Sequence, residues 1–261
     1  MSAHTDSLLA RLKPLLGPWA ARFDADLLET CASTNSELLT RAAAGAASGT
    51  VLWTLEQTAG RGRRGRGWVS NGLMFSLLWR FESPTALSGL SLAAGLAVAR
   101  ALDKLGVPNA ELKWPNDIWL EGRKLSGCLV EMSQSGARTS AVIGIGLNLA
   151  TPASDKVHDQ AATGLDTALP NPPEMTFVLA ELLKQLGEVL SEFALRGFAP
   201  FQADWNARNA LRGAAVRVID GASETQGVCL GVDVQGALLL ENERRVLSIV
   251  GGDVSLRSLR A

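Results

Sequence analysis

Apolar residues before residue 212 recur with two different spacings, which predict strands and helices. Continuous or alternating apolar runs typical of strands occur at residues 27–29, 51–56, 73–81, 111–120, 123–131 and 140–147. Spacing typical of helices occurs at residues 7–23, 36–44, 88–105, 174–195 and 198–209, with proline and glycine interrupting the first of them. Residues 151–173 carry several Pro, Asp and Thr, so we expect a loop there. Strongly apolar helices among long apolar strands predict an α+β domain in which helices cover a sheet.

After residue 212 the pattern of apolar residues changes from mixed helix and strand spacing to short strand-like runs. Short strand-like runs occur at residues 215–219, 225–232, 237–241 and 245–250, separated by turns at Asp220-Gly221, Gln235-Gly236 and Asn242-Glu243. Short antiparallel strands at this spacing are typical of a small β-barrel. We therefore expect two domains, a main one over residues 1–211 and a barrel over residues 212–261.

Composition and charge narrow the class of protein. The chain has 261 residues, of which 47% are hydrophobic and 20% charged, so a folded protein with a substantial core is expected and disorder is not. Lys and Arg number 25 against 26 Asp and Glu. A dedicated nucleic-acid binder normally carries a basic excess, so this balance argues against one.

Cysteine and histidine usage argues against several kinds of chemistry. Cys31, Cys128 and Cys229 have no metal-ligand spacing and are expected to be small buried apolar residues in a reducing compartment. His4 and His158 fall in terminal or loop contexts, so a histidine base or metal ligand is not expected. No signal-like segment and no run near 18 apolar residues occurs, which predicts a soluble cytoplasmic protein without a membrane partner.

An arginine- and glycine-rich segment lies between two predicted strands. Residues 60–67 contain four arginines and four glycines and end on Trp68. Glycine lets the backbone approach a ligand closely, and arginine offers a planar cationic fork suited to phosphate or carboxylate. A loop that folds over a small anion, a solvated basic turn and an arginine-glycine patch for nucleic acid are all compatible with this segment alone.

Two further segments present polar groups where a strand ends. Residues 33–37 join a strand to a helix, with Thr34 and Glu37 at capping-box spacing, and the alternative is that they only cap the helix. The break at residues 114–116 is expected to leave the ladder and to expose Lys113 and Asp117.

Two strands place glycine where a ligand could approach. Lys124 and Gly127 flank the start of one, although an ordinary charged hairpin tip would explain residues 121–124. In the other, Gly144 and Gly146 lack the third glycine and helix of a dinucleotide fingerprint. Their alternation strips one strand face of side chains, against which a flat ring can lie, with Asn148 as a polar edge.

Taken together and in order, five blocks resemble the biotin–protein ligases, from about residue 28 to the C-terminus. The blocks are Ser33-Thr34-Asn35, Gln57 to Arg66 ending on Trp68, Lys113-Trp114-Pro115-Asn116-Asp117, Arg123-Lys124-Leu125-Ser126-Gly127 and Gly144-Ile145-Gly146-Leu147-Asn148. The resemblance implies a mixed sheet with flanking helices, similar to class II tRNA-synthetase cores, and a C-terminal SH3-like barrel. It also implies that ATP and biotin form biotinyl-5′-AMP and pyrophosphate, and that the biotinyl group then passes to a lysine of a biotin carboxyl carrier protein.

The resemblance also implies roles for individual residues. A carboxylate must attack the α-phosphate, so positioned cations are needed and an enzyme nucleophile is not. Arg63 and Lys124 are expected nearest the biotin carboxylate and α-phosphate, with Arg61, Arg66 and Lys113 as phosphate or loop-ordering contacts. Mg²⁺ would ride on the pyrophosphate oxygens, without a dedicated protein site.

The remaining roles concern the ligand's two ends and the second step. The residues expected to read the ureido head are Ser33, Thr34, Asn35 and Gln57, helped by the backbone at Gly60, Arg61 and Gly62. The residues expected to form the floor are Gly127, Gly144 and Gly146. Asn148 and Trp68 are assigned to the adenylate side, Asp117 to the acceptor lysine and Arg257 to the ATP phosphates.

Two alternatives to this enzyme class stay open, together with one departure from the family. A lipoate ligase or octanoyl transferase could use the same scaffold, and an arginine-loop nucleic-acid binder is the minor alternative. Some family members carry an N-terminal helix-turn-helix module, whereas only about 27 residues precede the first strand here, so we expect a ligase without operator binding. We expect a monomer or a weak homodimer.

Overall fold

The main sheet of the computed structural model has seven strands in the order β1-β2-β3-β7-β6-β5-β4. The structure describes residues 3–68, 72–81, 87–135, 138–152, 156–157, 160–220, 223–243, 245–250 and 254–258. The strands are β1 (Asp24–Cys31), β2 (Thr50–Gln57), β3 (Gly72–Phe81), β4 (Glu111–Lys113), β5 (Asp117–Leu120), β6 (Arg123–Ser135) and β7 (Arg138–Asn148). β1 and β2 run parallel and the other neighbouring pairs run antiparallel, so the predicted mixed sheet is confirmed. The predicted break at residues 114–116 separates β4 from β5.

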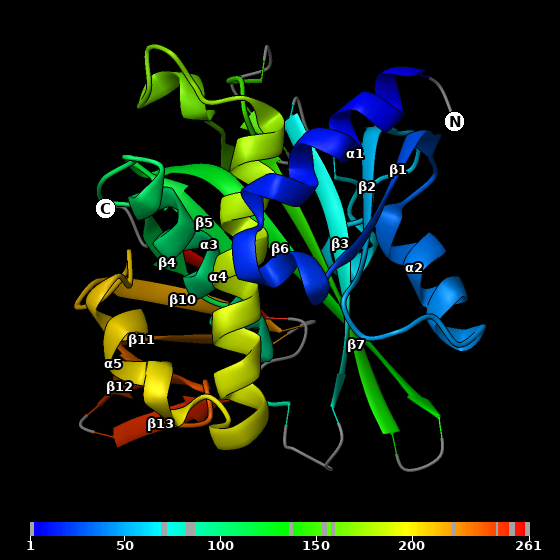
Figure 1. Ribbon diagram of the computed structural model, residues 1–261. Coiled ribbons are helices and arrows are strands. Elements are labelled where there is room, and N and C mark those ends of the chain that lie inside the picture. Colours follow the sequence, from blue (N-terminus) through cyan, green and yellow to red (C-terminus); the bar gives the residue numbers. More distant parts are fainter. Residues whose placement is uncertain are drawn as a thin grey trace.

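Helices cover both faces of this sheet (Figure 1). α3 (Leu90–Lys104) and α4 (Met175–Arg196) lie on one face, and α1 (Ala3–Leu15) packs against α4. α2 (Thr34–Ala43) lies on the other face, where it is the crossover between the parallel strands β1 and β2. The helix predicted over residues 198–209 is shorter than expected: a 3₁₀ turn, η4 (Ala199–Phe201), precedes α5 (Gln202–Ala207).

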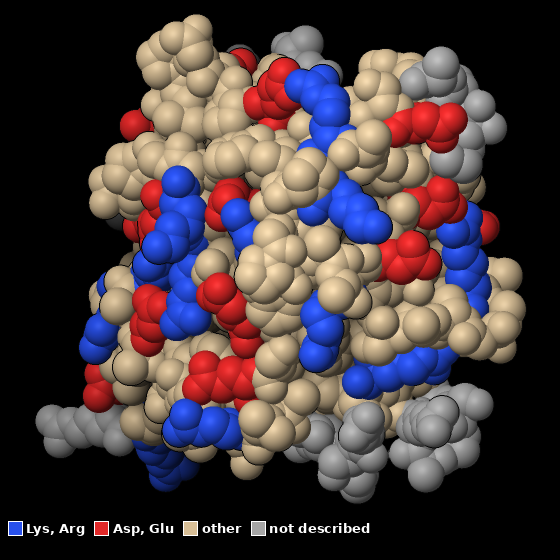
Figure 2. Space-filling model, in the orientation of Figure 1, with Lys and Arg blue, Asp and Glu red and all other residues tan. Residues whose placement is uncertain are grey.

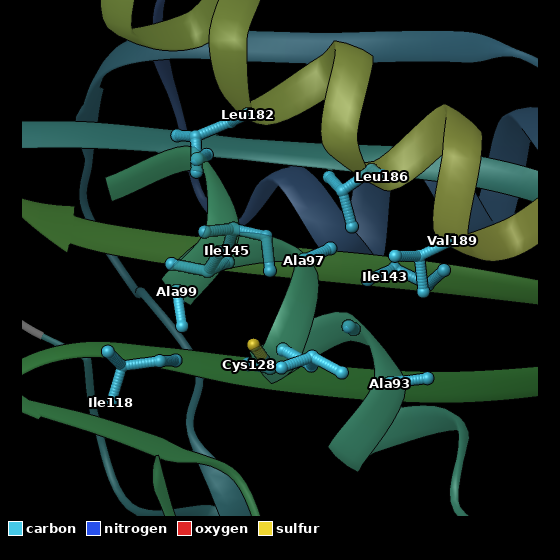
Figure 3. Close-up of a cluster of buried hydrophobic side chains, with 14 of the residues drawn as sticks. Ala93, Ala97, Ala99, Ile118, Cys128, Ile143, Ile145, Leu182, Leu186 and Val189 are labelled. Carbon is cyan, nitrogen blue, oxygen red and sulfur yellow. The ribbon is translucent and has the colours of Figure 1, made fainter. Parts of the chain in front are cut away.

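The two faces of the sheet are packed to different extents, because side chains alternate along each strand. Ile143 and Ile145 of β7 point toward α3 and α4 and meet Leu186 in the large core cluster (Figure 3). Val142 points the other way and joins a much smaller cluster with Leu38 of α2. Most of the buried apolar surface therefore lies between the sheet and the α3–α4 layer.

The end of the chain forms a separate antiparallel sheet. Its strands are β10 (Ala215–Asp220), β11 (Ser223–Val232), β12 (Leu238–Asn242), β13 (Arg245–Ile249) and β14 (Val254–Ser258), in the order β13-β12-β11-β10-β14. The four predicted strands are present, and β14 is an addition that the sequence pattern did not indicate. Among the described residues β13 and β14 are both edge strands, so the sheet is open rather than a closed barrel.

The C-terminal sheet packs directly on the main body. The indole Nε1 of Trp114, in the turn between β4 and β5, donates to Gly236 O at 3.1 Å. Gly236 has a φ of +83°, and a Cβ there would lie 2.8 Å from the Cα of Gly89, so no larger residue fits this contact. Val216 and Leu240 belong to the same core cluster as α3 and α4. The boundary at residues 211–212 stays a prediction.

The predicted loop at residues 151–173 contains short ordered pieces in its described parts. They are β8 (Lys156–Val157), β9 (Gln160–Ala161) and η3 (Leu165–Thr167). The predicted irregular turn after α1 is present as η1 (Gly17–Ala21). None of the helices within the described ranges combines the length and the apolar character that crossing a bilayer requires.

Candidate functional site

A cavity opens on the α2 face of the sheet, beside the N-terminal end of α2. α2 covers this face at Leu78 and Val142, but farther along β7 the same face carries Gly144 and Gly146. Gly127 of β6 pairs with Gly146 and extends this bare area. The space between atoms, counted to the solvent-open mouth, is about 1120 Å³. The sheet therefore continues beneath the cavity, whereas α2, which covers the neighbouring part of the sheet, has its N-terminal end at the cavity rim.

Most residues predicted to form the site line this one cavity. They are Ser33, Thr34, Asn35, Gln57, Arg61, Gly62, Arg63, Arg66, Trp68, Lys113, Asp117, Lys124, Gly127, Gly144, Gly146 and Asn148. Gly60 lies outside the lining, where its carbonyl accepts from the Trp68 N–H at 2.8 Å. Arg257 lies on β14, opposite Arg217 of β10, and its side chain is outside the described part of the chain. Segments far apart in the sequence thus converge on the α2 end of the sheet.

The start of α2 differs by one residue from the prediction. Ser33, not Thr34, is the N-cap, and its Oγ accepts from Ser36 N at 3.5 Å. Thr34 is already helical and buried, and its N–H and hydroxyl donate to Gln57 Oε1 at 2.8 and 3.2 Å. The capping box proposed for Thr34 and Glu37 is therefore wrong, because the Thr34 side chain turns toward β2 instead of the helix end.

A buried hydroxyl that the sequence analysis missed joins this network. Ser76 of β3 donates to Thr34 Oγ1 at 2.8 Å and to Asn35 Oδ1 at 2.5 Å, so its one hydrogen serves two acceptors in this geometry. The Asn35 amide donates to Leu129 O at 3.1 Å and to Glu131 Oε2 at 3.0 Å. A lone serine in the apolar run of residues 73–81 was the signal available in the sequence.

Two hydrogen-bond donors at this end of the cavity have no acceptor among the residues that the structure describes. The Thr34 hydroxyl and both Asn35 amide hydrogens are already engaged. Within the described residues, the amide Nε2 of Gln57 has no partner, and the Ser33 hydroxyl accepts a bond without donating one. Since polar groups in a cavity tend to be satisfied, these donors are suited to an oxygen acceptor on a ligand.

The arginine- and glycine-rich segment forms a closed loop over the mouth of the cavity. Gly62 N donates to Arg66 O at 2.7 Å. The residues between them form the short 3₁₀ turn η2 (Arg63–Gly65). Arg64 takes a left-handed conformation, with φ of 58° and ψ of 34°. The first arginine of the loop, Arg61, directs its guanidinium to the Glu131 carboxylate, Nη2 to Oε1 at 2.8 Å. The loop is thus held by its own backbone and by an ion pair near its start.

The bare strand face is filled by the protein's own side chains. A Cβ on Gly144 would lie 2.2 Å from Asn35 Oδ1, and a Cβ on Gly146 would lie 2.2 Å from the Trp68 ring. The Trp68 ring therefore occupies the position where a ligand ring was expected. Its Nε1 is buried and has no hydrogen-bond partner within the described ranges. The glycines are required, as predicted, but in this structure they make room for Asn35 and Trp68.

The cationic end of the cavity is built from β4, β5 and β6. Lys124 Nζ lies 2.6 Å from Asp117 Oδ1 and 5.3 Å from the centroid of the Trp68 ring. Lys113 Nζ lies 4.4 Å above the Trp119 ring. Only 6% of Lys113 and 9% of Asp117 is exposed, so the prediction that the break would expose them is wrong.

The turn between β4 and β5 explains that burial. Asn116 Nδ2 donates to Cys128 O at 2.7 Å, and Cys128 N donates to Asn116 O at 2.9 Å. Trp114, at 2% exposure, packs into the core instead of projecting outward. Burial raises the pKa of the Cys128 thiol to about 12, so this cysteine is not a thiolate nucleophile at neutral pH.

The remaining predicted residue, Asn148, lies at the end of β7. Its Nδ2 donates to Thr163 O at 3.0 Å, and Thr163 N donates to Lys124 O at 3.0 Å. Ala162, which lines the cavity beside them, and Thr163 were missed because their loop shows no periodic pattern. Across the described residues, no group of three or more His, Cys, Asp or Glu could hold a metal ion.

Comparisons with known proteins agree with this geometry. Residues 28–148 match the model of the biotin/lipoate A/B protein ligase family. The chain is 39% identical over 232 residues to the bifunctional ligase/repressor BirA of Escherichia coli, covering 87% of this chain and 72% of BirA. It is 38% identical over 251 residues to the biotin–[acetyl-CoA-carboxylase] ligase of Mycobacterium tuberculosis, covering 92% and 91%. A solved biotin protein ligase from Aquifex aeolicus, in complex with biotin and ATP, superposes with a TM-score of 0.77 at 31% identity, over 90% of this chain and 99% of that one.

Proposed function

The chain belongs to the biotin/lipoate A/B protein ligase family, and from this membership we propose that it is an ATP-dependent biotin–protein ligase. It activates biotin as biotinyl-5′-AMP, with release of pyrophosphate, and transfers the biotinyl group to a lysine of a biotin carboxyl carrier protein. The observation that carries the proposal is the order of groups along the cavity. Donors at Ser33 and Gln57 lie at one end, a glycine floor follows, and cationic side chains lie at the other end. Biotinyl-5′-AMP has a ureido group, an apolar ring and chain, and a phosphate in the same order.

The polar end favours biotin over lipoate. A ureido oxygen can accept from Gln57 Nε2 and from the Ser33 hydroxyl, the two donors that find no acceptor in the described part of the chain. The dithiolane of a lipoyl group offers only weakly accepting sulfur, so these donors would lose their water without gaining a partner. An unsatisfied buried donor costs about 1–3 kcal/mol, which supports discrimination between the two acids at this end.

The cationic end supports the first step. The biotin carboxylate and the α-phosphate are both anionic, and Arg63 and Lys124 lie in the lining where their charges can neutralise that repulsion. The carboxylate oxygen bonds to the α-phosphorus while the bond to pyrophosphate breaks. Mg²⁺ arrives with ATP on its phosphate oxygens and stabilises the leaving pyrophosphate.

The second step needs a deprotonated acceptor lysine. Asp117 is held 2.6 Å from Lys124, so we assign it first to positioning Lys124 and only through that contact to the transfer step. The adenine is assigned to the end of the cavity beside Asn148 and Trp68, and the ATP phosphates to Arg257. The amine attacks the acyl carbon of the mixed anhydride, forms the amide and releases AMP.

The wider setting follows from the same family. We propose that the C-terminal sheet corresponds to an SH3-like barrel, that the protein is cytoplasmic, and that it works as a monomer or weak dimer on a carrier domain. Basic and acidic side chains are interspersed on the face shown in Figure 2, so nothing in this view favours the nucleic-acid alternative.

Biotin-dependent exchange of pyrophosphate into ATP tests the proposal. Exchange with biotin, its absence with lipoate or octanoate, and subsequent labelling of a carrier domain are the expected results. Exchange that depends on lipoate would instead identify the protein as a lipoate ligase. Salt-sensitive binding of duplex or single-stranded nucleic acid, without any exchange, would favour the arginine-loop alternative.

A further inference from the structure

Glu131 lies beneath the cavity rim and had no part in the predicted site. It is on β6, opposite Val142 of β7, so its side chain points to the α2 face together with those of Leu129 and Val142. Apolar residues fill this face under α2, and a carboxylate among them needs partners. Its side chain is only 22% exposed.

The Glu131 carboxylate accepts hydrogen bonds from two different segments. From the loop, Arg61 donates Nη2 to Oε1 at 2.8 Å and Nη1 to Oε2 at 3.2 Å. From the start of α2, Asn35 donates Nδ2 to Oε2 at 3.0 Å. Arg61 Nη1 also donates to Ser36 Oγ at 3.0 Å, which joins the two segments a second time. Such bidentate arginine contacts are among the more directional ion pairs.

These contacts determine what Asn35 offers the ligand. One amide hydrogen goes to Glu131 and the other to Leu129 O, which leaves Oδ1 facing Ser76 and Gly144. With its donors engaged, Asn35 can only accept at this position. Loss of the Glu131 carboxylate would release one donor and let the amide turn.

They also determine what the first loop arginine can do. While its guanidinium is paired with Glu131, Arg61 is directed toward the root of the loop, not toward the cationic end formed with Lys124. Arg63 and Arg66 lie farther along the loop and line the cavity. Of the two roles considered for Arg61, phosphate contact or ordering of the loop, this geometry favours ordering.

We propose that Glu131 is a positioning residue for the ligase reaction, which ties the first arginine of the loop to the end of α2 that reads the ureido group. Closing the loop and aligning Asn35 then depend on one carboxylate. This role rests on the proposed function, because a loop that retains biotinyl-5′-AMP has meaning only in a ligase. One readout must therefore be independent of any ligand.

The ligand-free readout is trypsin cleavage of the native protein. Trypsin cuts after the loop arginines, so the rate of cleavage within residues 61–66, followed by mass spectrometry, reports how firmly the loop is held. Glu131→Gln, which keeps the shape and removes the charge, is expected to speed cleavage after Arg63, Arg64 and Arg66 about five-fold, as for a half-exposed charged pair. Asp26→Asn, which breaks the matched Arg41–Asp26 ion pair on the edge strand β1, is expected to leave loop cleavage unchanged.

The second readout is release of biotinyl-5′-AMP from the loaded protein. Glu131→Gln and Arg61→Gln are each expected to raise the release rate about five-fold. In Glu131→Gln, whose altered side chain lies outside the cavity lining, kcat for transfer at saturating carrier should change less than two-fold. Because both residues act through one contact, the double variant should be no worse than either single variant. Glu131→Asp should recover part of the loss.

Different failures have different meanings. If Glu131→Gln alters neither loop cleavage nor release, the positioning role is overturned. If Arg61→Gln raises the KM for ATP and Glu131→Gln does not, Arg61 contacts phosphate and the proposal is wrong. If the unaltered protein makes no biotinyl-5′-AMP, the proposed function fails, whereas faster trypsin cleavage in Glu131→Gln would still support the contact that holds the loop.

Discussion

On the α3–α4 face of the main sheet, β7 presents Ile143 and Ile145 to two helices, whereas on the opposite face the same strand presents Gly144 and Gly146 to a cavity. Consecutive residues of one strand thus differ completely in what they contribute. Burying an isoleucine side chain stabilises a fold by roughly 1.5–3 kcal/mol, while glycine within a strand costs about 0.5–1 kcal/mol. The packed face offsets the cost of leaving the other face open for a ligand.

Stability and ligand binding can therefore be changed separately in this fold. A substitution on the packed face should alter the free energy of unfolding and leave the chemistry of folded molecules alone. A substitution on the cavity face should do the reverse.

The largest effect is expected on the packed face. Ile143→Ala removes a fully buried side chain that packs against α4, and should lower the free energy of unfolding by about 3 kcal/mol. Urea denaturation measures the loss. The KM for biotin and ATP and the kcat per folded molecule should stay within two-fold of the unaltered protein. A large rise in either KM would mean that the two faces are coupled through β7.

The next effect is expected at the cationic end of the cavity. Lys124→Ala should slow biotin-dependent ATP–pyrophosphate exchange by on the order of 10²-fold or more, because a preorganised charge near the reacting phosphate is lost. Lys104→Ala, at an exposed position near the end of α3, is the control. Normal exchange combined with slow transfer to the carrier would assign Lys124 to the second step instead.

A smaller effect is expected from adding one methyl group to the floor. In Gly146→Ala the new Cβ would lie 2.2 Å from the Trp68 ring, so the indole must leave its position. We expect the KM for ATP to rise about ten-fold, in the range of one misplaced methyl group in a pocket, with unfolding almost unchanged. Ala141→Gly, on the same strand but at a buried position of the packed face, should show the opposite pattern. Equal KM values for Gly146→Ala and the unaltered protein would exclude a role for this floor in nucleotide binding.

The smallest effect is expected at the polar edge of the packed layer. Burial by itself would raise the pKa of Asp204, but the hydrogen bonds from Arg208 and Arg100 together outweigh it and hold that pKa below its ordinary value. The stabilisation is therefore present above the unfolded pKa near 3.8 and is lost as the pH falls through the lower folded value. Asp204→Asn should cost about 1 kcal/mol or less at pH 7, and the difference from the unaltered protein should shrink in acid. A constant difference down to the acid limit would contradict the ion-pair explanation.

Much of the fold was predictable because its strands are long and their apolar patterns strong. Residues 73–81 and 140–147 could be assigned with little context, and the mixed sheet followed from the family resemblance. β14 was not predicted, because residues 254–258 stand in a short polar end of the chain. The cap at Ser33 was misassigned by one position, since serine and threonine are adjacent and both are good caps.

Prediction of the site succeeded where residues belong to local motifs and failed where partners are distant in sequence. Asn35 and Glu131 are 96 positions apart, and Ser76 is 41 positions from Asn35. Period-two alternation on β6 puts Glu131 on the same face as Gly127, yet nothing local indicates that Arg61 meets it. The expected exposure of Lys113 and Asp117 failed for the same reason, because β6 and the C-terminal sheet enclose their turn.

The position of the Trp68 ring against Gly146 has a thermodynamic consequence for ligand binding. Any ring that lies flat on this strand competes with a side chain of the protein that is already there. Its apparent dissociation constant equals the intrinsic constant divided by the fraction of molecules in which the strand is bare. Residues that stabilise the Trp68 ring in this position, without touching the ligand, can therefore change the affinity for such a ligand.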